Sequence, residues 1–130
     1  QQITKIMRLV ALLIVLNSAI GFCQEADFHI DKPVFKFAKT YEGTLLKHTF
    51  IGKNTGDIPL IISDYNVSCS CTKAIFSKDP IPPGASFKIE VQFDTKGKYY
   101  FQDRVVYFKT NSKKGKEQVR FKVNVIPKNE

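Results

Sequence analysis

Apolar and polar residues alternate with a period of two along much of the chain after residue 24. Residues 87–94 read FKIEVQFD, and residues 118–125 read QVRFKVNV. Because successive side chains of a β-strand point to opposite faces, each pattern predicts a strand with one buried face. Residues 45–53 predict a third such strand, with Leu46, His48 and Phe50 on one face.

Shorter apolar segments predict further strands. Residues 60–62 and 105–108 are apolar on both faces, which is typical of central strands, and residues 34–37 and 72–76 are shorter candidates. Clusters of turn-forming residues separate the strands, at residues 54–57, 82–84, 95–98 and 111–115. The body shows no amphipathic helical spacing, so it is predicted to be all-β.

The number and spacing of these segments indicate a fold class. About seven short strands in roughly 100 residues predict an antiparallel β-sandwich of the immunoglobulin-like type. Two facing sheets would bury the alternating Phe and Val side chains, and this burial is the main stabilising contribution. The sandwich domain is predicted to cover residues 35–130. Residues 24–34 are a lead-in segment, in which residues 27–32 form either a first strand or a frayed end.

The first 23 residues have the features of a secretory signal peptide. Lys5 and Arg8 precede the apolar run LVALLIVL at residues 9–16, and small residues follow it. This run is shorter than the about 20 apolar residues that span a bilayer. No stable transmembrane span is therefore expected after signal removal. Met7 is the only methionine and is the candidate start of translation.

Two routes of signal processing would both place the body outside the cytoplasm. Gly21 and Cys23 occupy the third and first positions before a cut ahead of Gln24, which suits ordinary signal peptidase. In the alternative route Cys23 becomes the lipid-modified first residue of a lipoprotein, but the bulky Phe22 before it disfavours this route. We expect simple release into the periplasm or cell envelope.

Charge narrows the classes of partner. The chain carries 20 Lys and Arg against 12 Asp and Glu, a net charge of +8. Hydrophobic residues make up 43% of the chain, which is typical of a globular domain and excludes disorder of the body. A basic surface favours an acidic partner, here another envelope protein or a surface polymer. Arg is the residue suited to bidentate phosphate contacts, and the body has only Arg104 and Arg120, so no nucleic-acid partner is predicted.

One basic loop is a candidate anion-binding site. Four lysines lie in or beside the polar hairpin loop at residues 111–115: Lys109, Lys113, Lys114 and Lys116. A Lys-rich hairpin loop is more often a solvated turn than a phosphate-binding site, and we favour that interpretation.

The segment Cys69-Ser70-Cys71 carries the most unusual candidate chemistry. In an extended strand these cysteines point to the same face, with Cα atoms near the upper limit for a disulfide, about 6.8 Å. A bridge therefore requires a bent backbone. Three interpretations stay open: a structural disulfide at a strand corner, which we favour for an exported protein, a redox pair, or two thiolate ligands of copper or zinc. The spacing brings neither His29 nor His48 to the cysteines, so no metal site is predicted.

The sequence indicates no catalytic arrangement. His48 is a lone histidine on a strand and is expected to pack there rather than to pair with a catalytic cysteine. Asp94 and Asp103 have no carboxylate partner at a spacing that suggests acid–base hydrolysis. Neither a Gly-rich phosphate loop nor a nucleophile elbow occurs. We predict that the protein is not an enzyme and uses no cofactor.

Several short motifs together resemble one bacterial family. They are HTF at 48–50, KNTG at 53–56, PLII at 59–62, SCSCT at 68–72, IPPG at 81–84, VQFDTKG at 91–97 and KTN at 109–111. This combination is similar to domain of unknown function 1573, which is common in exported proteins of Bacteroidota, and the resemblance covers residues 35–126. The family usually has glycine where this chain has Ser70.

The resemblance implies an immunoglobulin-like sandwich, similar to domains found in ciliary and flagellar proteins, and no known catalytic activity. It gives Cys69 and Cys71 a recurrent place without an established role. The predicted function is a non-enzymatic, exported β-sandwich that binds or scaffolds in the cell envelope. The alternative is a thiol-redox or soft-metal protein that uses copper or zinc at Cys69 and Cys71.

Overall fold

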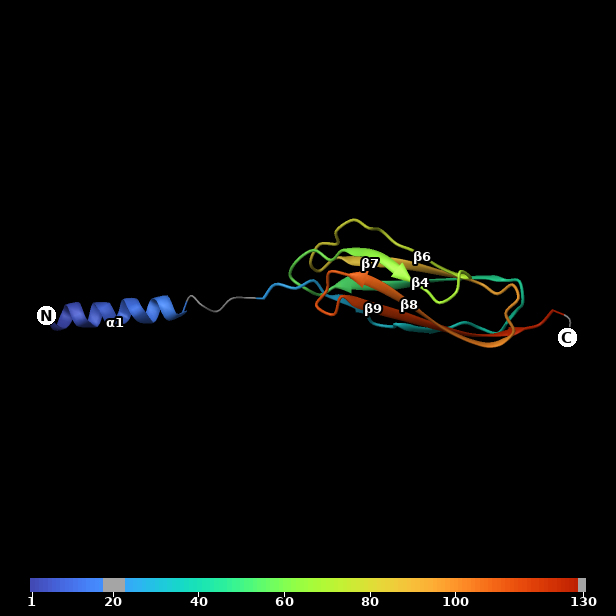
Figure 1. Cartoon of the computed structure of the whole chain (residues 1–130), viewed down its shortest axis with the longest axis horizontal. Helices are drawn as coiled ribbons and strands as arrows, with labels where there is room; N and C mark the ends of the chain where they lie inside the picture. Colours follow the sequence, from blue (N-terminus) through green and yellow to red (C-terminus); the bar gives the residue numbers. More distant parts are fainter. Residues whose placement is uncertain (18–22, 129–130) are drawn as a thin grey trace.

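The structure, a computed structural model, describes residues 1–17 and 23–128, with the side chains of residues 13–17 left out of the description. It consists of one helix followed by a β-sandwich (Figure 1). The elements are α1 (Gln2–Asn17), β1 (Phe28–Ile30), β2 (Val34–Lys36), β3 (Thr40–Tyr41), β4 (Leu45–Asn54), β5 (Ile62–Asn66), β6 (Thr72–Ile75), β7 (Ser86–Asp94), β8 (Tyr100–Thr110) and β9 (Lys116–Ile126).

The strands form two stacked sheets, which confirms the predicted all-β sandwich. One sheet has the order β1-β4-β7-β6, and the other has the order β2-β9-β8-β5, with β3 also paired to β9. The long pairs β4–β7 and β8–β9 are antiparallel, as predicted. The short strands β2 and β3 run parallel to β9, so the second sheet is mixed rather than antiparallel throughout.

The core lies between the sheets and is filled by the apolar columns of the alternating pattern. The most deeply buried large side chains are Phe50, Leu60, Ile62, Ile89, Val91, Phe93, Val106, Phe108, Val119, Phe121, Val123 and Val125. Since burying one large apolar side chain is worth roughly 1.5–3 kcal/mol, these columns account for most of the favourable energy of the fold. As predicted, residues 23–128 contain no helix.

The sandwich begins earlier than the sequence predicted. β1 pairs with the end of β4, with Phe28 opposite Asn54 and Ile30 opposite Gly52. Both Phe28 and Ile30 are buried, so β1 belongs to the core, and the boundary placed at residue 35 is too late. Gly52 permits this packing, because a Cβ atom there would lie 2.3 Å from the ring of Phe87. With β1 and the short β3, the described strands number nine rather than about seven.

The prediction of a central strand at residues 60–62 is wrong. Only Ile62 enters a strand, and β5 lies at the edge of its sheet. Leu60 is nevertheless fully buried, because it forms an isolated bridge with Ile81 at the end of the sandwich. Ile61 points away from the core and is 40% exposed.

β5 covers only part of its neighbour β8. It pairs with residues 107–110, whereas β9 pairs with β8 along residues 100–109. After Asn66 the chain leaves this sheet, turns at residues 67–71 and enters the other sheet as β6. Among the described strands, none therefore pairs with residues 101–106 of β8 on the side away from β9.

α1 covers most of the segment predicted as a signal peptide, and the side chains of residues 1–12 are exposed. Within the described part of the chain, no helix has both the length and the apolarity that crossing a bilayer requires. Gly21 and Phe22, on which the predicted processing depends, lie outside the described residues.

Candidate functional site

Cys69 and Cys71 lie at the corner that joins β5 to β6. Their sulfur atoms are bonded to each other, and their Cα atoms are 5.2 Å apart. This distance is below the disulfide limit of about 6.8 Å because the backbone bends at the corner, as the sequence required. The corner is anchored at both ends: Thr72 N–H donates to the carbonyl of Cys69 (3.1 Å), and Asp94 N–H on β7 donates to the carbonyl of Cys71 (2.9 Å).

Ser70 lies in the corner with a backbone conformation that is not left-handed. Among the described residues other than glycine, positive φ occurs at Tyr100 and not at Ser70. A glycine is therefore not required at position 70, because this turn uses a backbone conformation open to any residue. Thr72, which follows the disulfide, is buried opposite Phe93 and begins β6.

Replacing both cysteines with serine is expected to lower the free energy of unfolding by less than about 2 kcal/mol, because a disulfide across two residues restricts the unfolded chain little. Urea unfolding of the Cys69→Ser/Cys71→Ser variant measures this difference. Wild-type protein in dithiothreitol provides the control and should lose a similar amount. A loss above about 3 kcal/mol would contradict this expectation and make the disulfide a principal stabilising contact.

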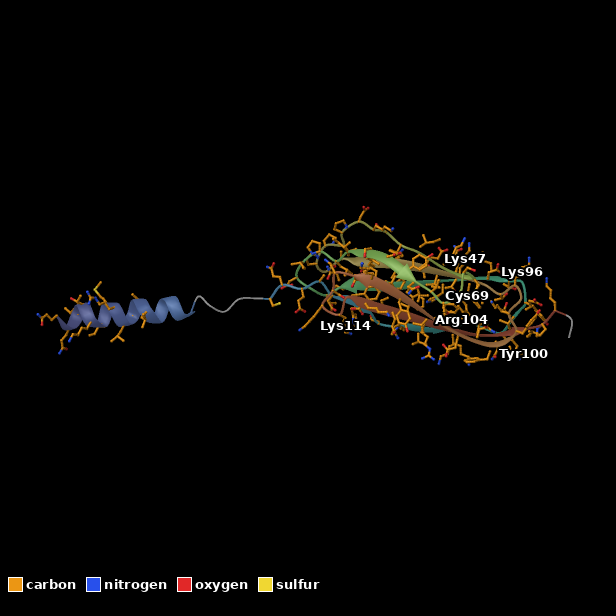
Figure 2. The ribbon with its side chains drawn as sticks, in the orientation of Figure 1. Lys47, Cys69, Lys96, Tyr100, Arg104 and Lys114 are labelled. Carbon is orange, nitrogen blue, oxygen red and sulfur yellow. A yellow bond between two sulfur atoms is a disulfide. The ribbon has the colours of Figure 1, made fainter. Side chains whose placement is uncertain are left out.

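Arg104 is an unusual inward-pointing cation on β8. Its guanidinium carbon lies 5.8 Å from the centre of the Phe93 ring, and its Nη2 donates to Gln102 Oε1 at 2.8 Å. Its Nε is buried and has no hydrogen-bond partner among the described residues. Figure 2 shows Arg104 and Cys69 between Lys114 at one end of the sandwich and Tyr100 at the other.

Arg104 was not among the site residues predicted from the sequence, although a signal was present. Arg104 shares its parity on β8 with Val106 and Phe108, so the alternation assigns it to the inward face. Burying an unpaired donor is costly, so a cation in a column of apolar residues is uncommon. Such a residue can therefore be recognised in the sequence as a candidate for a specific role.

The two histidines are engaged away from the cysteine corner. His48 stacks on Phe35 with ring centres 3.6 Å apart and meets Phe50 edge-on at 4.6 Å. Burial lowers the pKa of His48, so the imidazole stays neutral near pH 7. His29 Nε2 lies 2.7 Å from Asp31 Oδ1 on the surface. Among the described residues, no group of three or more His, Cys, Asp or Glu side chains is placed to hold a metal ion.

The structure separates the four lysines of the candidate anion-binding loop into two pairs. Lys109 and Lys116 lie opposite each other on β8 and β9. They line a groove of about 430 Å³ together with Asp64 and Tyr107. Lys116 Nζ lies 4.3 Å from the centre of the Tyr107 ring, so this aromatic face is already covered by a cation.

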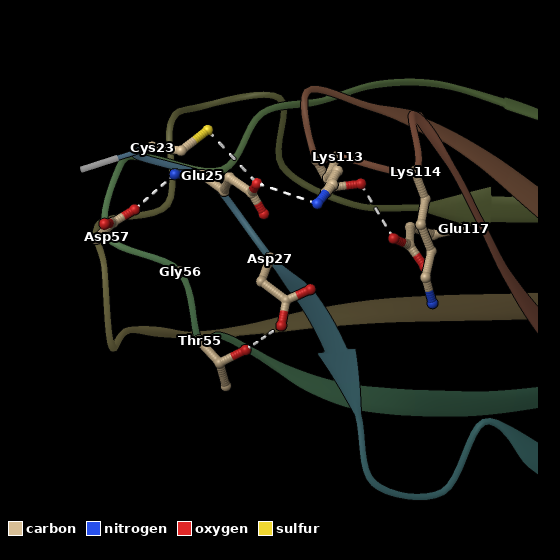
Figure 3. Close-up of a pocket in the computed structure, with 10 residues that line it drawn as sticks. Cys23, Glu25, Asp27, Thr55, Gly56, Asp57, Lys113, Lys114 and Glu117 are labelled. Carbon is tan, nitrogen blue, oxygen red and sulfur yellow. Dashed lines mark hydrogen bonds and ion pairs between the residues drawn. The ribbon is translucent and has the colours of Figure 1, made fainter. Parts of the chain in front are cut away.

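Lys113 and Lys114 line a different pocket, of about 510 Å³, close to Cys23 (Figure 3). The same pocket is lined by four carboxylates: Glu25, Asp27, Asp57 and Glu117. Lys113 Nζ lies 3.7 Å from Glu25 Oε1, and Asp57 Oδ1 accepts from Glu25 N–H at 2.6 Å. The surroundings of this pair are therefore acidic, and the four lysines do not converge on one anion.

Asp103 and Arg120 form a bidentate pair on the outer face of the second sheet. Arg120 Nε donates to Asp103 Oδ1 at 2.7 Å, and Arg120 Nη2 donates to Asp103 Oδ2. The hydrogen bond from Arg120 lowers the pKa of Asp103 below its ordinary 3.8, and the charges of Arg120 and Lys122 lower it further.

The Asp103 pair is expected to stabilise the fold above pH 3.8, and its contribution is lost as the pH falls through the depressed pKa of the folded state. Titrating the carboxyl carbon of Asp103 by NMR measures this pKa. In the Arg120→Gln variant it should rise toward 3.8, since the donor and the charge are both removed. An unchanged pKa in this variant would contradict the assignment of the shift to Arg120.

Comparisons with known proteins identify one matching family and several solved structures of the same fold. A family model described as "Protein of unknown function (DUF1573)" matches residues 28–125. No curated protein matches the chain significantly. A crystal structure of a protein of unknown function from Porphyromonas gingivalis W83 is similar with a TM-score of 0.69 and 14% identity, over 82% of this chain and 50% of that chain.

Two further solved structures share the fold. The ASH/PapD-like domain 7 of human CEP192 has a TM-score of 0.57 and 11% identity, with 84% of this chain and 90% of that chain covered. The secreted serine protease VesC from Vibrio cholerae has a TM-score of 0.56 and 12% identity, over 78% of this chain and 23% of that chain. This chain thus spans half of the Porphyromonas protein and less than a quarter of VesC, and such low identities show the fold alone.

Proposed function

Since the chain belongs to the DUF1573 family, as its motifs predicted, we propose that it is a non-enzymatic, exported β-sandwich that binds or scaffolds another component of the cell envelope. The filled core carries this proposal. Facing side chains such as Ile89, Phe108 and Phe121 are fully buried, so chemistry is left to loops, outer faces and strand edges. Sandwiches use these surfaces to bind partners.

Two observations support export. The segment of Lys5 and Arg8 followed by an apolar run has the order of a secretory signal. The disulfide between Cys69 and Cys71 suits an oxidising compartment, where such bonds form and persist. Mass spectrometry of the protein from cell envelopes tests processing: a mature chain that begins at Gln24, free or cyclised, supports simple release, and a lipid-modified Cys23 supports lipidation.

A thiol-redox or soft-metal function is the second candidate. Cys69 and Cys71 are both only half-buried, so reductants and metal carriers can reach them. Strained or exposed disulfides tend to be the labile ones.

Thiol titration in glutathione buffers, followed by copper and zinc analysis, separates the two candidates. For a binding module we expect a pair that stays oxidised in glutathione buffers set to about −180 to −210 mV, and no stoichiometric metal. Reversible reduction in that range, or one bound metal ion per chain, would replace the binding module with the redox or metal protein.

A further inference from the structure

We propose that the open edge of β8, residues 101–105, binds an extended acidic segment of another polypeptide as an added strand. This inference rests on the proposed binding function and names the surface and the class of partner. β5 occupies the fourth position of the second sheet only beside residues 107–110. The added strand would fill the rest of that position, a length of about 17 Å at the usual rise of a strand.

The hydrogen-bond pattern shows which backbone groups face the open edge. On β9, Arg120 N–H donates to the carbonyl of Pro33, and the carbonyl of Lys122 accepts from Phe37 N–H. Arg120 and Lys122 therefore direct their backbone groups away from β8. Backbone groups alternate in direction along a strand, so Phe121 and the other odd-numbered residues of β9 direct theirs toward β8. In the antiparallel register their partners are the even-numbered residues of β8, such as Arg104 opposite Phe121.

The odd-numbered residues of β8 therefore direct their N–H and C=O groups to the other side. At residues 109 and 111 these groups meet the β5 segment: Ser63 donates to the carbonyl of Lys109, and Asn111 N–H donates to the carbonyl of Ile61. The same groups of Phe101, Asp103 and Val105 face a side on which no described strand lies. Such a row of donors and acceptors is a template for strand addition.

The side chains on the outer face of the open edge favour a peptide over a polar polymer. Phe101 is 55% exposed, and Val105 is half-buried. Residues of an added strand opposite Phe101 and Val105 would cover these apolar side chains, as cross-strand neighbours do within a sheet.

The inward side chains of the added strand would face Arg104, and this position selects an acid. Arg104 Nε is buried and has no hydrogen-bond partner among the described residues, and Nη2 donates to the side-chain oxygen of Gln102. A carboxylate beside Arg104 would accept from the guanidinium in a charge-assisted hydrogen bond, which is stronger than a neutral one. The excess of Lys and Arg over acids in the chain attracts the same class of partner.

A second open edge, on β4, lacks this chemistry and provides the matched control. β1 pairs with residues 52–54 of β4, and no described strand lies beside residues 45–51 on the side of β4 away from β7. There the inward residue His48 is already covered by the ring of Phe35 at 3.6 Å. The even-numbered residues Asn54 and Thr44 bond toward β7 and its turn. Thr49 is odd-numbered, so its N–H points to the opposite, open side.

The probe is a blocked seven-residue peptide of alternating Val and Glu, titrated into the full chain and followed by NMR of the backbone amides. We expect saturable binding with the largest shifts at Phe101, Asp103 and Val105. A Val–Gln peptide should bind about tenfold more weakly, because the carboxylate beside Arg104 is lost. A Val–Glu peptide with methylated backbone nitrogens should lose binding, because it cannot donate to β8. These two peptides leave the protein unchanged.

Protein variants test the same surface from the other side. Val105→Pro removes an N–H from the open edge and should weaken binding about tenfold, whereas Thr49→Pro makes the same change on β4 and should leave binding unchanged. Arg104→Gln should weaken binding about tenfold, and Arg120→Gln, on the outer face, by less than about twofold.

Absence of saturable binding, shifts confined to β4 or the lysine loop, or equal effects of the two proline variants would overturn the inference. Formation of a dimer that Val105→Pro abolishes would also overturn it, since a second copy would then occupy the open edge. These outcomes leave the proposed binding function standing. A bound metal or a readily reduced disulfide would remove the proposed function instead, whatever the peptide does.

Discussion

Replacing Phe121 with alanine is expected to lower the free energy of unfolding by about 3–5 kcal/mol. Phe121 is fully buried in the middle of β9, and its ring centre lies 5.1 Å from that of Phe93 and 5.9 Å from that of Phe37. The substitution removes a contact between the two sheets and leaves a cavity that neighbouring side chains fill only in part. Urea unfolding followed by circular dichroism measures the loss.

Phe101→Ala is the matched control, because it removes the same ring from an exposed position of the neighbouring strand. We expect this variant to stay within about 0.5 kcal/mol of the wild type. Domains of this size are stable by only about 5–15 kcal/mol, so the Phe121 variant should also melt at a clearly lower temperature. Equal losses in the two variants would show that the packing between the sheets is not what stabilises the fold.

The long strands could be predicted because their pattern repeats often enough to be read. β7 and β9 alternate over eight or more residues, and their inward positions are buried in the structure. Successive side chains of a strand point to opposite faces, and only one face is buried here. The apolar positions of these segments therefore also predicted which side chains form the core.

The short strands were predicted only in part: β2 and β6 lie within the predicted segments 34–37 and 72–76, whereas β3 was missed and β1 was left open between a strand and a frayed end, because two or three residues carry too little periodicity. β1 is a strand because the end of β4 offers it backbone partners, and Gly52 leaves room for the packing of Phe87. The edge position of β5 likewise depends on the corner at Cys69 and Cys71, which takes the chain to the other sheet. Such pairings are decided by the tertiary structure, which overrides local preference.

The candidate site was predictable in part, and for a similar reason. Sequence spacing alone required a bent backbone for Cys69 and Cys71 to bond, and the structure has that bend. The lysines were grouped because they are close in sequence, but β8 and β9 hold Lys109 and Lys116 on an outer face while Lys113 and Lys114 lie beside carboxylates. The open edge of β8 has no sequence signal, because it exists only where β5 ends.

The turn at residues 54–57 acquires a specific explanation from the structure. Asn54 is fully buried, and its side chain makes four hydrogen bonds. Its Oδ1 accepts from Asp27 N–H (3.1 Å) and Gly56 N–H (3.0 Å), and its Nδ2 donates to the carbonyls of Ile58 (2.9 Å) and Ile81 (3.0 Å). One amide thus joins the entry to β1, its own turn and the segment before β7. Only Asn or Gln carries both donors and acceptors of this kind, and Gln is longer.

Asn54→Ala is therefore expected to lower the free energy of unfolding by about 3 kcal/mol or more, because buried backbone groups lose their partners and each costs about 1–3 kcal/mol. Urea unfolding measures the total, and hydrogen exchange locates it. The amide of Asp27 should exchange faster than in the wild type, since its acceptor is Asn54 Oδ1.

Asn66→Ala provides the control, because Asn66 is exposed at the end of β5 and the same truncation there should change stability by less than about 0.5 kcal/mol. If Asn54→Ala costs no more than this control, water must replace the lost amide, and the turn would be held by its backbone alone. If it costs the expected amount but exchange at Asp27 is unchanged, the loss arises at Ile58 and Ile81 instead. The entry to β1 would then be held by the backbone bond from Asp57 N–H to the carbonyl of Glu25, at 2.8 Å.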